Sequence, residues 1–330
     1  MLILAKAVMA TMLGFSFSVI FGYLVVKYFK SRQIRQSVSA SLGKRHIKKE
    51  GTATMGGIIF IFPTIIIMLC LLLTKKIEFS TNLFIVLFVF LAYALLGFID
   101  DYLIIKNRNN KGLSVFTKLF LQIVIALVFF YMFLSNGREP IVNIYTLGIK
   151  LNFGWFYGMF LLFVLVATSN AVNITDGLDG LAGGLSAIAF FAFGIITWGA
   201  NWVSGYEEIA VFCFVLVGSL LGFLVYNAHP AKIFMGDTGS LSLGAALASV
   251  AIISNHELTL VVVALVFVIE TLSVIIQYIA ISKFHTKVFL MAPIHHHFEK
   301  LGWDEVDIVR FFWSIGLILS MAAITFGVWI

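Results

Sequence analysis

Ten long apolar stretches are the feature that most constrains how this chain can fold. A helix that spans a lipid bilayer needs roughly 20 predominantly apolar residues. These stretches are too long for the strands of a membrane barrel, so only helices satisfy their backbone groups in lipid. The sequence therefore predicts an all-α, polytopic integral membrane protein, with spans at about 2–26, 55–73, 82–99, 117–134, 155–173, 181–200, 208–227, 239–254, 258–281 and 308–329.

The composition excludes an ordinary soluble domain. The chain is 61% hydrophobic and only 12% charged, whereas a soluble domain is about 45–50% apolar and about 25% charged. The first apolar stretch has no basic segment before it and no small-residue cleavage site, which favours a retained helix over a signal peptide. Cys70 and Cys213 both lie inside apolar stretches, so we interpret them as small apolar residues, not as a disulfide or a metal site.

Basic residues predict the orientation of the spans. Of the 22 Lys and Arg residues, 17 fall in one set of loops, and by the positive-inside rule this set is cytoplasmic. The membrane thus explains the net charge of +6, and nucleic acid is not expected as a partner. Both termini are then extracytoplasmic. Residues 1–330 are expected to form one transmembrane domain, with cytoplasmic loops at about 28–54, 102–116, 174–180, 228–238 and 282–307.

Five aspartates stand at the edges of apolar stretches, where carboxylates are costly and usually functional. The order of the spans places all five on the cytoplasmic side, together with a triple histidine, and the outer loops hold no comparable cluster. We therefore predict one cytoplasmic site that handles phosphates and a metal, although a pair of solvated helix-end charges remains the alternative for the first two. The five are Asp100, Asp101, Asp176, Asp179 and Asp237.

The segment NAVNITDGLDG combines amides and carboxylates at a spacing of three residues. Asn170 and Asn173 can share a helix face, as can Asp176 and Asp179. Such groups suit ribose hydroxyls, the edge of a uracil or a hydrated metal. Capping of the following helix by Asp176 is the structural alternative.

Three other features carry polar chemistry. FMGDTGS places Asp237 at the start of a helix, where capping is again the alternative, and Phe234 offers a face on which a base can stack. The adjacent histidines at 295–297 cannot all face one ion in regular structure, so nearby phosphates are better partners than zinc. Glu270 falls within the predicted ninth helix, and a structural hydrogen bond to a neighbour is the favoured interpretation.

Five motifs, GTATMGG, FIDDYL, NAVNITDGLDGLAGG, FMGDTGS and PIHHHFEKLGW, together resemble those of the polyprenyl-phosphate sugar-1-phosphate transferases. The match runs from about Lys48 to Trp303, and the triple histidine before FEKLGW favours the phospho-N-acetylmuramoyl-pentapeptide transferase family. This resemblance implies transfer of phospho-MurNAc-pentapeptide from its UDP carrier to undecaprenyl phosphate, which yields lipid I and UMP for peptidoglycan synthesis. It implies Mg²⁺ as cofactor and a site on the cytoplasmic face of a bacterial cytoplasmic membrane, surrounded by membrane lipids. A homodimer is left open.

The resemblance also implies particular site residues. The expected catalytic residues are Asp100, Asp101, Asp237 and His295. Asp237 is the expected Mg²⁺ ligand, since Mg²⁺ prefers oxygen ligands, usually keeps several waters, and is bound through one or two carboxylates together with substrate phosphates. The expected substrate-binding residues are Lys49, Thr54, Lys118, Asn173, Asp176, Gly177, Leu178, Asp179, Asn227, Phe234, His296 and His297.

Two positions depart from the pattern of the family. Ala53 stands where GTPTMGG has proline, and Ile104 stands where a lysine often follows the second acid. A transferase for another UDP-amino sugar is an alternative function. An ion-coupled transporter is a second alternative, but transporters place coupling residues near the midplane and often have internal repeats, and no repeat is found in this chain.

Overall fold

The fold is known from a computed structural model that describes residues 3–32, 52–107, 112–144, 148–199 and 206–328. In this part of the chain nine helices are long and apolar enough to cross a membrane, and Ile58–Leu73 is apolar but shorter. The helices are α1 (Ile3–Ser31), α3 (Ile58–Leu73), α4 (Thr81–Asn107), α5 (Val115–Ser135), α6 (Phe156–Thr175), α7 (Leu181–Gly199), α8 (Glu207–Asn227), α9 (Gly236–Ile253), α10 (Glu257–Val263), α11 (Leu265–Phe284), α12 (Ile294–Lys300) and α13 (Glu305–Val328).

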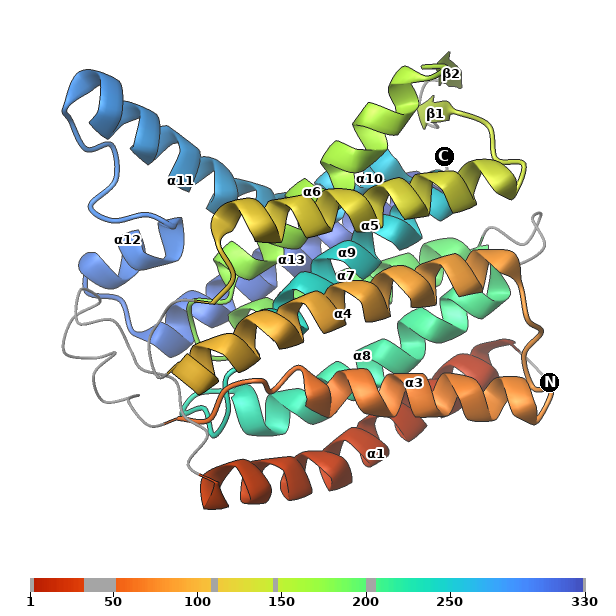
Figure 1. The fold of residues 1–330 in the computed structure, drawn as a ribbon, viewed down its shortest axis with the longest axis horizontal. Coiled ribbons are helices and arrows are strands. Elements are labelled where there is room, and N and C mark those ends of the chain that lie inside the picture. Colours follow the sequence, from red (N-terminus) through yellow and green to blue (C-terminus); the bar gives the residue numbers. More distant parts are fainter. Residues whose placement is uncertain (1–2, 33–51, 108–111, 145–147, 200–205, 329–330) are drawn as a thin grey trace.

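The all-helical, polytopic prediction is confirmed, with one correction. The predicted ninth span, 258–281, is two helices, because α10 ends at Val263 and α11 begins at Leu265. The chain has neither proline nor glycine at this break, so the pattern of apolar residues did not reveal it. After the break α11 turns away from the other helices, and it projects from the bundle in Figure 1.

A short hairpin lies in the connection between α5 and α6. Strand β1 (Ile141–Ile144) pairs with the antiparallel strand β2 (Ile149–Asn152), with Val142 opposite Leu151. Figure 1 places this hairpin at the end of the molecule opposite α12, and the start of α1 and the end of α13 lie at that same end.

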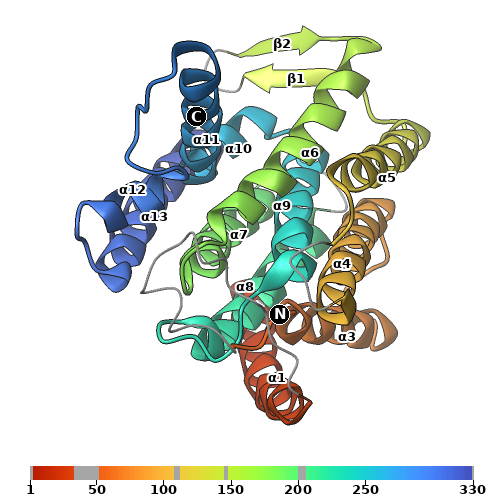
Figure 2. The same cartoon turned by 60° about the vertical axis from the view of Figure 1, so that its left-hand side comes forward.

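Helix α9 forms the centre of the bundle. It packs mainly against α4 and α6, and almost every one of its residues is buried. Figure 2 shows α9 surrounded by neighbouring helices. Its sequence, GDTGSLSLGAALASVAII, is rich in small residues, which allow helices in a membrane to approach closely. Close packing around α9 holds its first residue pair, Gly236 and Asp237, at a defined position.

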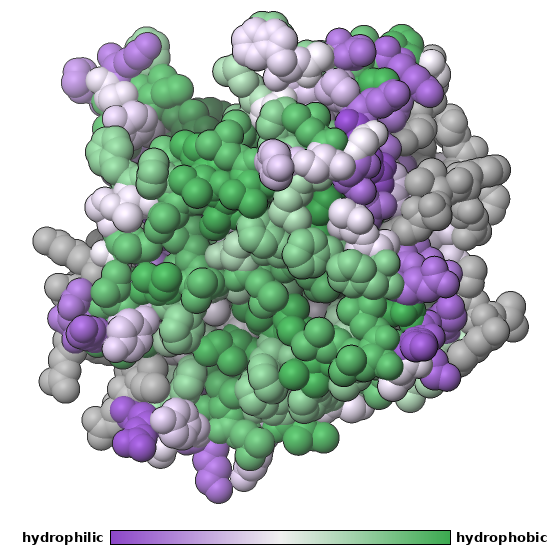
Figure 3. Space-filling view, turned by 45° about the vertical axis from the view of Figure 1, so that its right-hand side comes forward, coloured by the Kyte–Doolittle hydropathy of each residue, from purple (hydrophilic) through white to green (hydrophobic). Residues whose placement is uncertain are grey.

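The outer faces of the helices carry large apolar side chains. Residues such as Phe120, Phe163 and Ile318 are well exposed, at 63%, 69% and 67%. Figure 3 shows a broad hydrophobic face with hydrophilic residues gathered toward its margins. An exposed apolar belt of this extent is the surface expected where lipid is the surrounding solvent. The protein is therefore a multi-pass membrane protein.

Candidate active site

The N-terminus of α9 is capped by a residue from another helix. Asp101, on α4, accepts hydrogen bonds from the backbone N–H groups of Asp237 (3.1 Å) and Thr238 (2.9 Å), and from the Thr238 hydroxyl (2.6 Å). The first N–H groups of a helix have no partner within the helix, and an acidic side chain satisfies them well. Asp101, which is only 4% exposed, therefore fixes the position of Asp237.

Both oxygens of the Asp237 carboxylate have partners. The Lys118 ammonium contacts Oδ2, and the Asn173 amide donates to Oδ1 at 2.7 Å. The same amide donates to the Ser240 hydroxyl at 2.8 Å. Because α4, α5, α6 and α9 each contribute a side chain here, residues from distant parts of the sequence form one polar cluster.

Asp100 completes this cluster from α4. Its Oδ2 lies 3.7 Å from Lys118 Nζ, and its Oδ1 accepts from the backbone N–H of Leu113 at 2.8 Å. A Cβ at Gly112 would lie 2.6 Å from both Asp100 oxygens, so only glycine allows the backbone to pass so close. One lysine thus bridges the buried carboxylate of Asp100 and the partly exposed carboxylate of Asp237, which would otherwise repel each other.

Asp176 lies at the C-cap of α6, and not at the start of α7 as the capping alternative required. Its carboxylate accepts from the backbone N–H of Gly236. Burial, together with the nearby charges of Asp237, Asp101 and Asp179, raises the pKa of Asp176 to about 8. A bound cation would offset the repulsion among these carboxylates.

These donors fit the implied magnesium ion. Mg²⁺ takes oxygen ligands and is usually held by one or two protein carboxylates together with substrate phosphates. Asp237, at 21% exposure, is the most accessible carboxylate of the Lys118 cluster, whereas Asp100 is at 6%. Among the residues that the structure describes, the cluster combines several acids with one nearby lysine, Lys118. The donor set therefore suits Mg²⁺ at Asp237.

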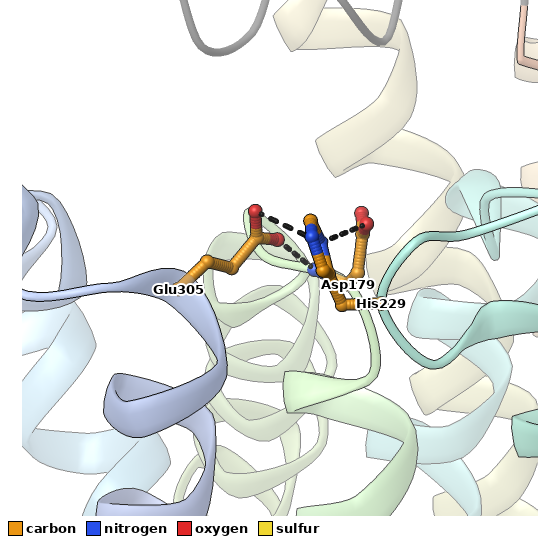
Figure 4. A group of neighbouring side chains, drawn as sticks. All are labelled: Asp179, His229 and Glu305. Atoms are coloured by element: carbon orange, nitrogen blue, oxygen red, sulfur yellow. Dashed lines mark hydrogen bonds and ion pairs between the residues drawn. The ribbon is translucent and has the colours of Figure 1, made fainter.

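Asp179 belongs to a second cluster (Figure 4). Its carboxylate accepts from the backbone N–H of Ala231 at 3.1 Å and lies 3.0 Å from Nδ1 of His229, while its own N–H donates to Glu305 at 2.7 Å. Glu305 Oε2 is 3.4 Å from the same imidazole nitrogen. A cavity of about 640 Å³ opens beside this group, lined in part by Thr52, Pro230 and Arg310. Asp179 thus connects the turn after α6 to the start of α13.

Three other predicted binding residues hold loops together. Asn227, at 2% exposure, accepts from the Gly180 N–H at 3.1 Å and donates to the Ile233 carbonyl at 3.0 Å. Phe234 is partly buried, and its N–H donates to the Ala53 carbonyl at 2.7 Å. Thr54 is buried beside this contact. Lys49 lies outside the described residues.

The three histidines point to different partners. His295 Nδ1 is 3.0 Å from Glu270, His296 Nδ1 is 2.6 Å from Glu299, and His297 Nδ1 accepts from the Leu290 N–H at 3.1 Å. His295 also packs against the Asp176–Asp179 turn, because a Cβ at Gly177 would lie 2.4 Å from its Nε2. Leu178, next in that turn, is buried at 3%. The histidines therefore do not share one ion through these nitrogens.

The sequence patterns missed several of these residues. Thr238 donates a hydrogen bond to Asp101, and Ser240 accepts one from Asn173. In an apolar helix, the sequence does not distinguish such hydroxyl residues from small residues that only allow close packing. Glu305 was missed although it begins α13; an acid in the first turn of a helix was a signal that could have identified a capping or binding residue. Asn170 was paired with Asn173 by spacing, yet it donates to Gln122 instead.

Known proteins are similar to this chain in sequence. The sequence profile of the glycosyl transferase family 4 matches residues 83–255, which include Asp100, Asp101, Lys118, Asn173 and Asp237. The fold and the polar cluster thus define a membrane-embedded transferase of this kind.

Comparison with individual proteins identifies the family of transferases more closely. The chain is 44% identical to phospho-N-acetylmuramoyl-pentapeptide-transferase of Geobacillus sp. (strain WCH70), over 98% of each chain. It is 43% identical to the protein of that name from Bacillus subtilis (strain 168), over 97% of each chain, and 44% identical to that from Bacillus licheniformis, over 96% of this chain and 97% of the relative. The chain belongs to the phospho-N-acetylmuramoyl-pentapeptide transferase family.

Proposed function

We propose that this protein transfers phospho-MurNAc-pentapeptide from UDP-MurNAc-pentapeptide to undecaprenyl phosphate, giving lipid I and UMP. The observation that carries this proposal is the Asp100–Lys118–Asp237 cluster, three charged groups from three helices at one end of the bundle. Membership of the family supplies the identity of the substrates. Because the cluster lies at one end of the helix bundle, a soluble nucleotide sugar and a lipid-bound phosphate can both reach it.

Asp237 is the proposed ligand of Mg²⁺, and Lys118 and Asn173 orient its carboxylate. When bound, the metal neutralises the negative charge that develops on the pyrophosphate as UMP leaves. Lys118 is itself placed to contact a phosphate oxygen, because its side chain is 20% exposed and its ammonium lies beside Asp237, the proposed metal ligand. Asp101 supports the site indirectly through the cap on α9.

Asp100 is the proposed group that orients or deprotonates the lipid phosphate. It lies near the cytoplasmic end that we predict for α4, whose outer residues Phe98 and Ile99 are exposed to the surrounding lipid. A lipid head group can therefore approach it laterally. An acid so placed can accept a proton from the attacking phosphate. Attack by an aspartate, most readily Asp237, in a double displacement is the competing pathway.

Asn173, Asp176, Asp179 and Phe234 are the proposed contacts of the nucleotide. Amide, carboxylate and aromatic groups suit a uridine, whereas a bare phosphate would need none of them. Asp176 and Asp179 both lie in the turn between α6 and α7, and Phe234 lies two residues before α9. His296 and His297 sit on the neighbouring α12 and are proposed to face the phosphates or sugar.

The site is proposed to lie on the cytoplasmic face. The 17-to-5 division of the basic residues supports this orientation. Single cysteines placed beside Asp101, Asp179 and His296 in a background that lacks Cys70 and Cys213 should react with a membrane-impermeant reagent only after the cells are opened. Labelling of the cysteine beside His296 in intact cells would overturn the orientation.

The two proposed subsites can be tested separately. Purified protein is given labelled UDP-MurNAc-pentapeptide and undecaprenyl phosphate, and UMP binding and single-turnover rates are measured for Asp179→Ala and Asp100→Asn. Loss of a nucleotide contact should weaken UMP binding by about 1–3 kcal/mol for each buried group left unpaired. Asp100→Asn should slow turnover with little change in UMP affinity. The opposite pattern, or use of UDP-GlcNAc in preference to UDP-MurNAc-pentapeptide, would contradict the proposal.

A further inference from the structure

A buried carboxylate and imidazole form a pair beneath the turn that carries Asp176. Glu270, on α11, and His295, on α12, are each 0% exposed, and Glu270 Oε2 lies 3.0 Å from His295 Nδ1. Burying an ionisable group is costly unless it is paired. The pair therefore holds α12 against α11 at the place where the sequence turns back toward the bundle.

Each partner of the pair keeps one polar atom without a hydrogen bond among the described residues. These atoms are Glu270 Oε1 and His295 Nε2, and both are buried. Buried polar atoms are nearly always hydrogen-bonded, so an exception calls for a functional explanation. A second buried glutamate, Glu257, also keeps one unpaired oxygen, but its partner is Tyr157 and no histidine is involved.

The free nitrogen of His295 is directed at the Asp176–Asp179 turn. A side chain at Gly177 would place its Cβ 2.4 Å from Nε2 and 2.9 Å from Cε1. The imidazole thus fills the space that the missing Gly177 side chain leaves, and Gly177 itself is only half-buried.

A carboxylate can only accept hydrogen bonds, so Glu270 requires a proton on His295 Nδ1. This contact fixes the orientation of the imidazole ring, with Nε2 toward Gly177.

We propose that Glu270 is a positioning residue of the transfer reaction: it acts through His295, whose imidazole it holds with Nε2 against the Asp176–Asp179 turn, where the nucleotide sugar is proposed to bind. Glu270 touches no substrate itself. The inference rests on the proposed function and deepens it, because it gives a role to a glutamate that the sequence pattern identified only as a structural hydrogen-bonding group.

A double-mutant cycle tests the inference on the full-length protein in detergent. Glu270→Gln keeps the size of the side chain and removes its charge; kcat should fall roughly 10- to 100-fold, as when a supporting partner of a functional group is lost, with KM for UDP-MurNAc-pentapeptide changed far less. In a His295→Ala background the same substitution should cause almost no further loss, because residues that act as one unit are not additive.

Glu257→Gln is the matched control, since Glu257 is also buried and also has one unpaired oxygen. As a single variant, Glu257→Gln should leave kcat unchanged. In the His295→Ala background it should also cause no further change in kcat. If Glu270→Gln fails to fold, Gly177→Ala displaces the same imidazole from the side of the turn. It should lower kcat in the wild type but cause little further loss with His295→Ala.

The outcomes are distinct. A kcat of Glu270→Gln near that of wild type would overturn the role of Glu270 while leaving the transferase assignment intact. So would losses that multiply when His295→Ala is combined with Glu270→Gln or with Gly177→Ala. A wild-type protein that releases no UMP from UDP-MurNAc-pentapeptide would instead overturn the proposed function.

Discussion

Gly97 of α4 lies directly against the backbone of Asp237 at the start of α9. A Cβ at Gly97 would stand 2.1 Å from the Asp237 carbonyl oxygen and 2.3 Å from its carbonyl carbon. The absence of a side chain three residues before Asp100 therefore lets α4 and α9 approach closely, and this approach brings Asp100, Asp101 and Asp237 together.

Gly97→Ala should displace the first turn of α9, because the clash is with backbone and no flexible side chain can give way. Overpacking of a well-packed interior lowers the free energy of unfolding by about 1–3 kcal/mol. Turnover should also fall strongly, because Asp237 is displaced. Thermal unfolding and UMP release measure the two effects. Gly183→Ala is the control, since its Cβ would first meet the mobile end of Leu224 at 3.2 Å. Equal activity of the two variants would contradict the expectation.

Asp101→Ala should loosen the start of α9 by removing the acceptor of three hydrogen bonds. Loss of a helix cap costs about 0.5–2 kcal/mol, and both the unfolding temperature and turnover should fall. Ser80→Ala removes a weaker cap, a 3.2 Å bond to the Leu83 N–H at the other end of α4. That variant should lose stability only. Full turnover in Asp101→Ala would show that the cap does not place Asp237.

Lys118→Met should leave Asp100 and Asp237 without the cation that lies between them. We expect a loss of stability of about 1–3 kcal/mol, as for a hydrogen bond to a charged group, together with loss of turnover. Added Mg²⁺ should raise the unfolding temperature of this variant more than that of wild type, because a cation replaces the missing charge. Lys6→Met breaks an exposed pair with Glu207 and should show neither effect. An identical response of wild type and Lys118→Met to Mg²⁺ would argue against a metal at Asp237.

Glu257 should make the protein less stable as the pH rises. Burial raises its pKa from 4.5 to about 7 in the folded protein, so the folded state holds this proton more tightly than the unfolded state between those pH values. Stability then falls as the pH rises from about 4.5 to 7, and it is fully present only below about 4.5.

The unfolding temperature measured from pH 5 to pH 7.5 should therefore fall less steeply in Glu257→Gln than in wild type. Tyr157→Phe should steepen the fall, because the Tyr157 hydroxyl donates to Glu257 Oε1 at 2.5 Å and lowers the pKa of that carboxyl. Parallel curves for wild type and Glu257→Gln would show that Glu257 does not contribute.

The amino-acid sequence by itself determined the class of fold and the chemistry of the site. Apolar stretches of membrane-spanning length can satisfy their backbone groups in lipid only as helices, so nine spans and the shorter α3 followed from length and hydropathy. Carboxylates such as Asp100 and Asp237 were identifiable because their position beside lipid is costly. The triple histidine was predicted not to share one ion, and in the structure the Nδ1 atoms of the three rings have three different partners.

Only the tertiary structure decided which polar groups act on one another. The break between α10, which ends at Val263, and α11, which begins at Leu265, coincides with neither proline nor glycine, so no local breaker marks it. Asp100 and Asp101 are adjacent in sequence, yet one faces Lys118 and the other caps α9. Glu270 and His295, 25 residues apart, meet because α11 leaves the bundle and α12 returns to it. Hydrogen bonds between distant residues depend on the approach of helices, and that approach is set by side-chain packing over the whole bundle, which no short pattern in the sequence records.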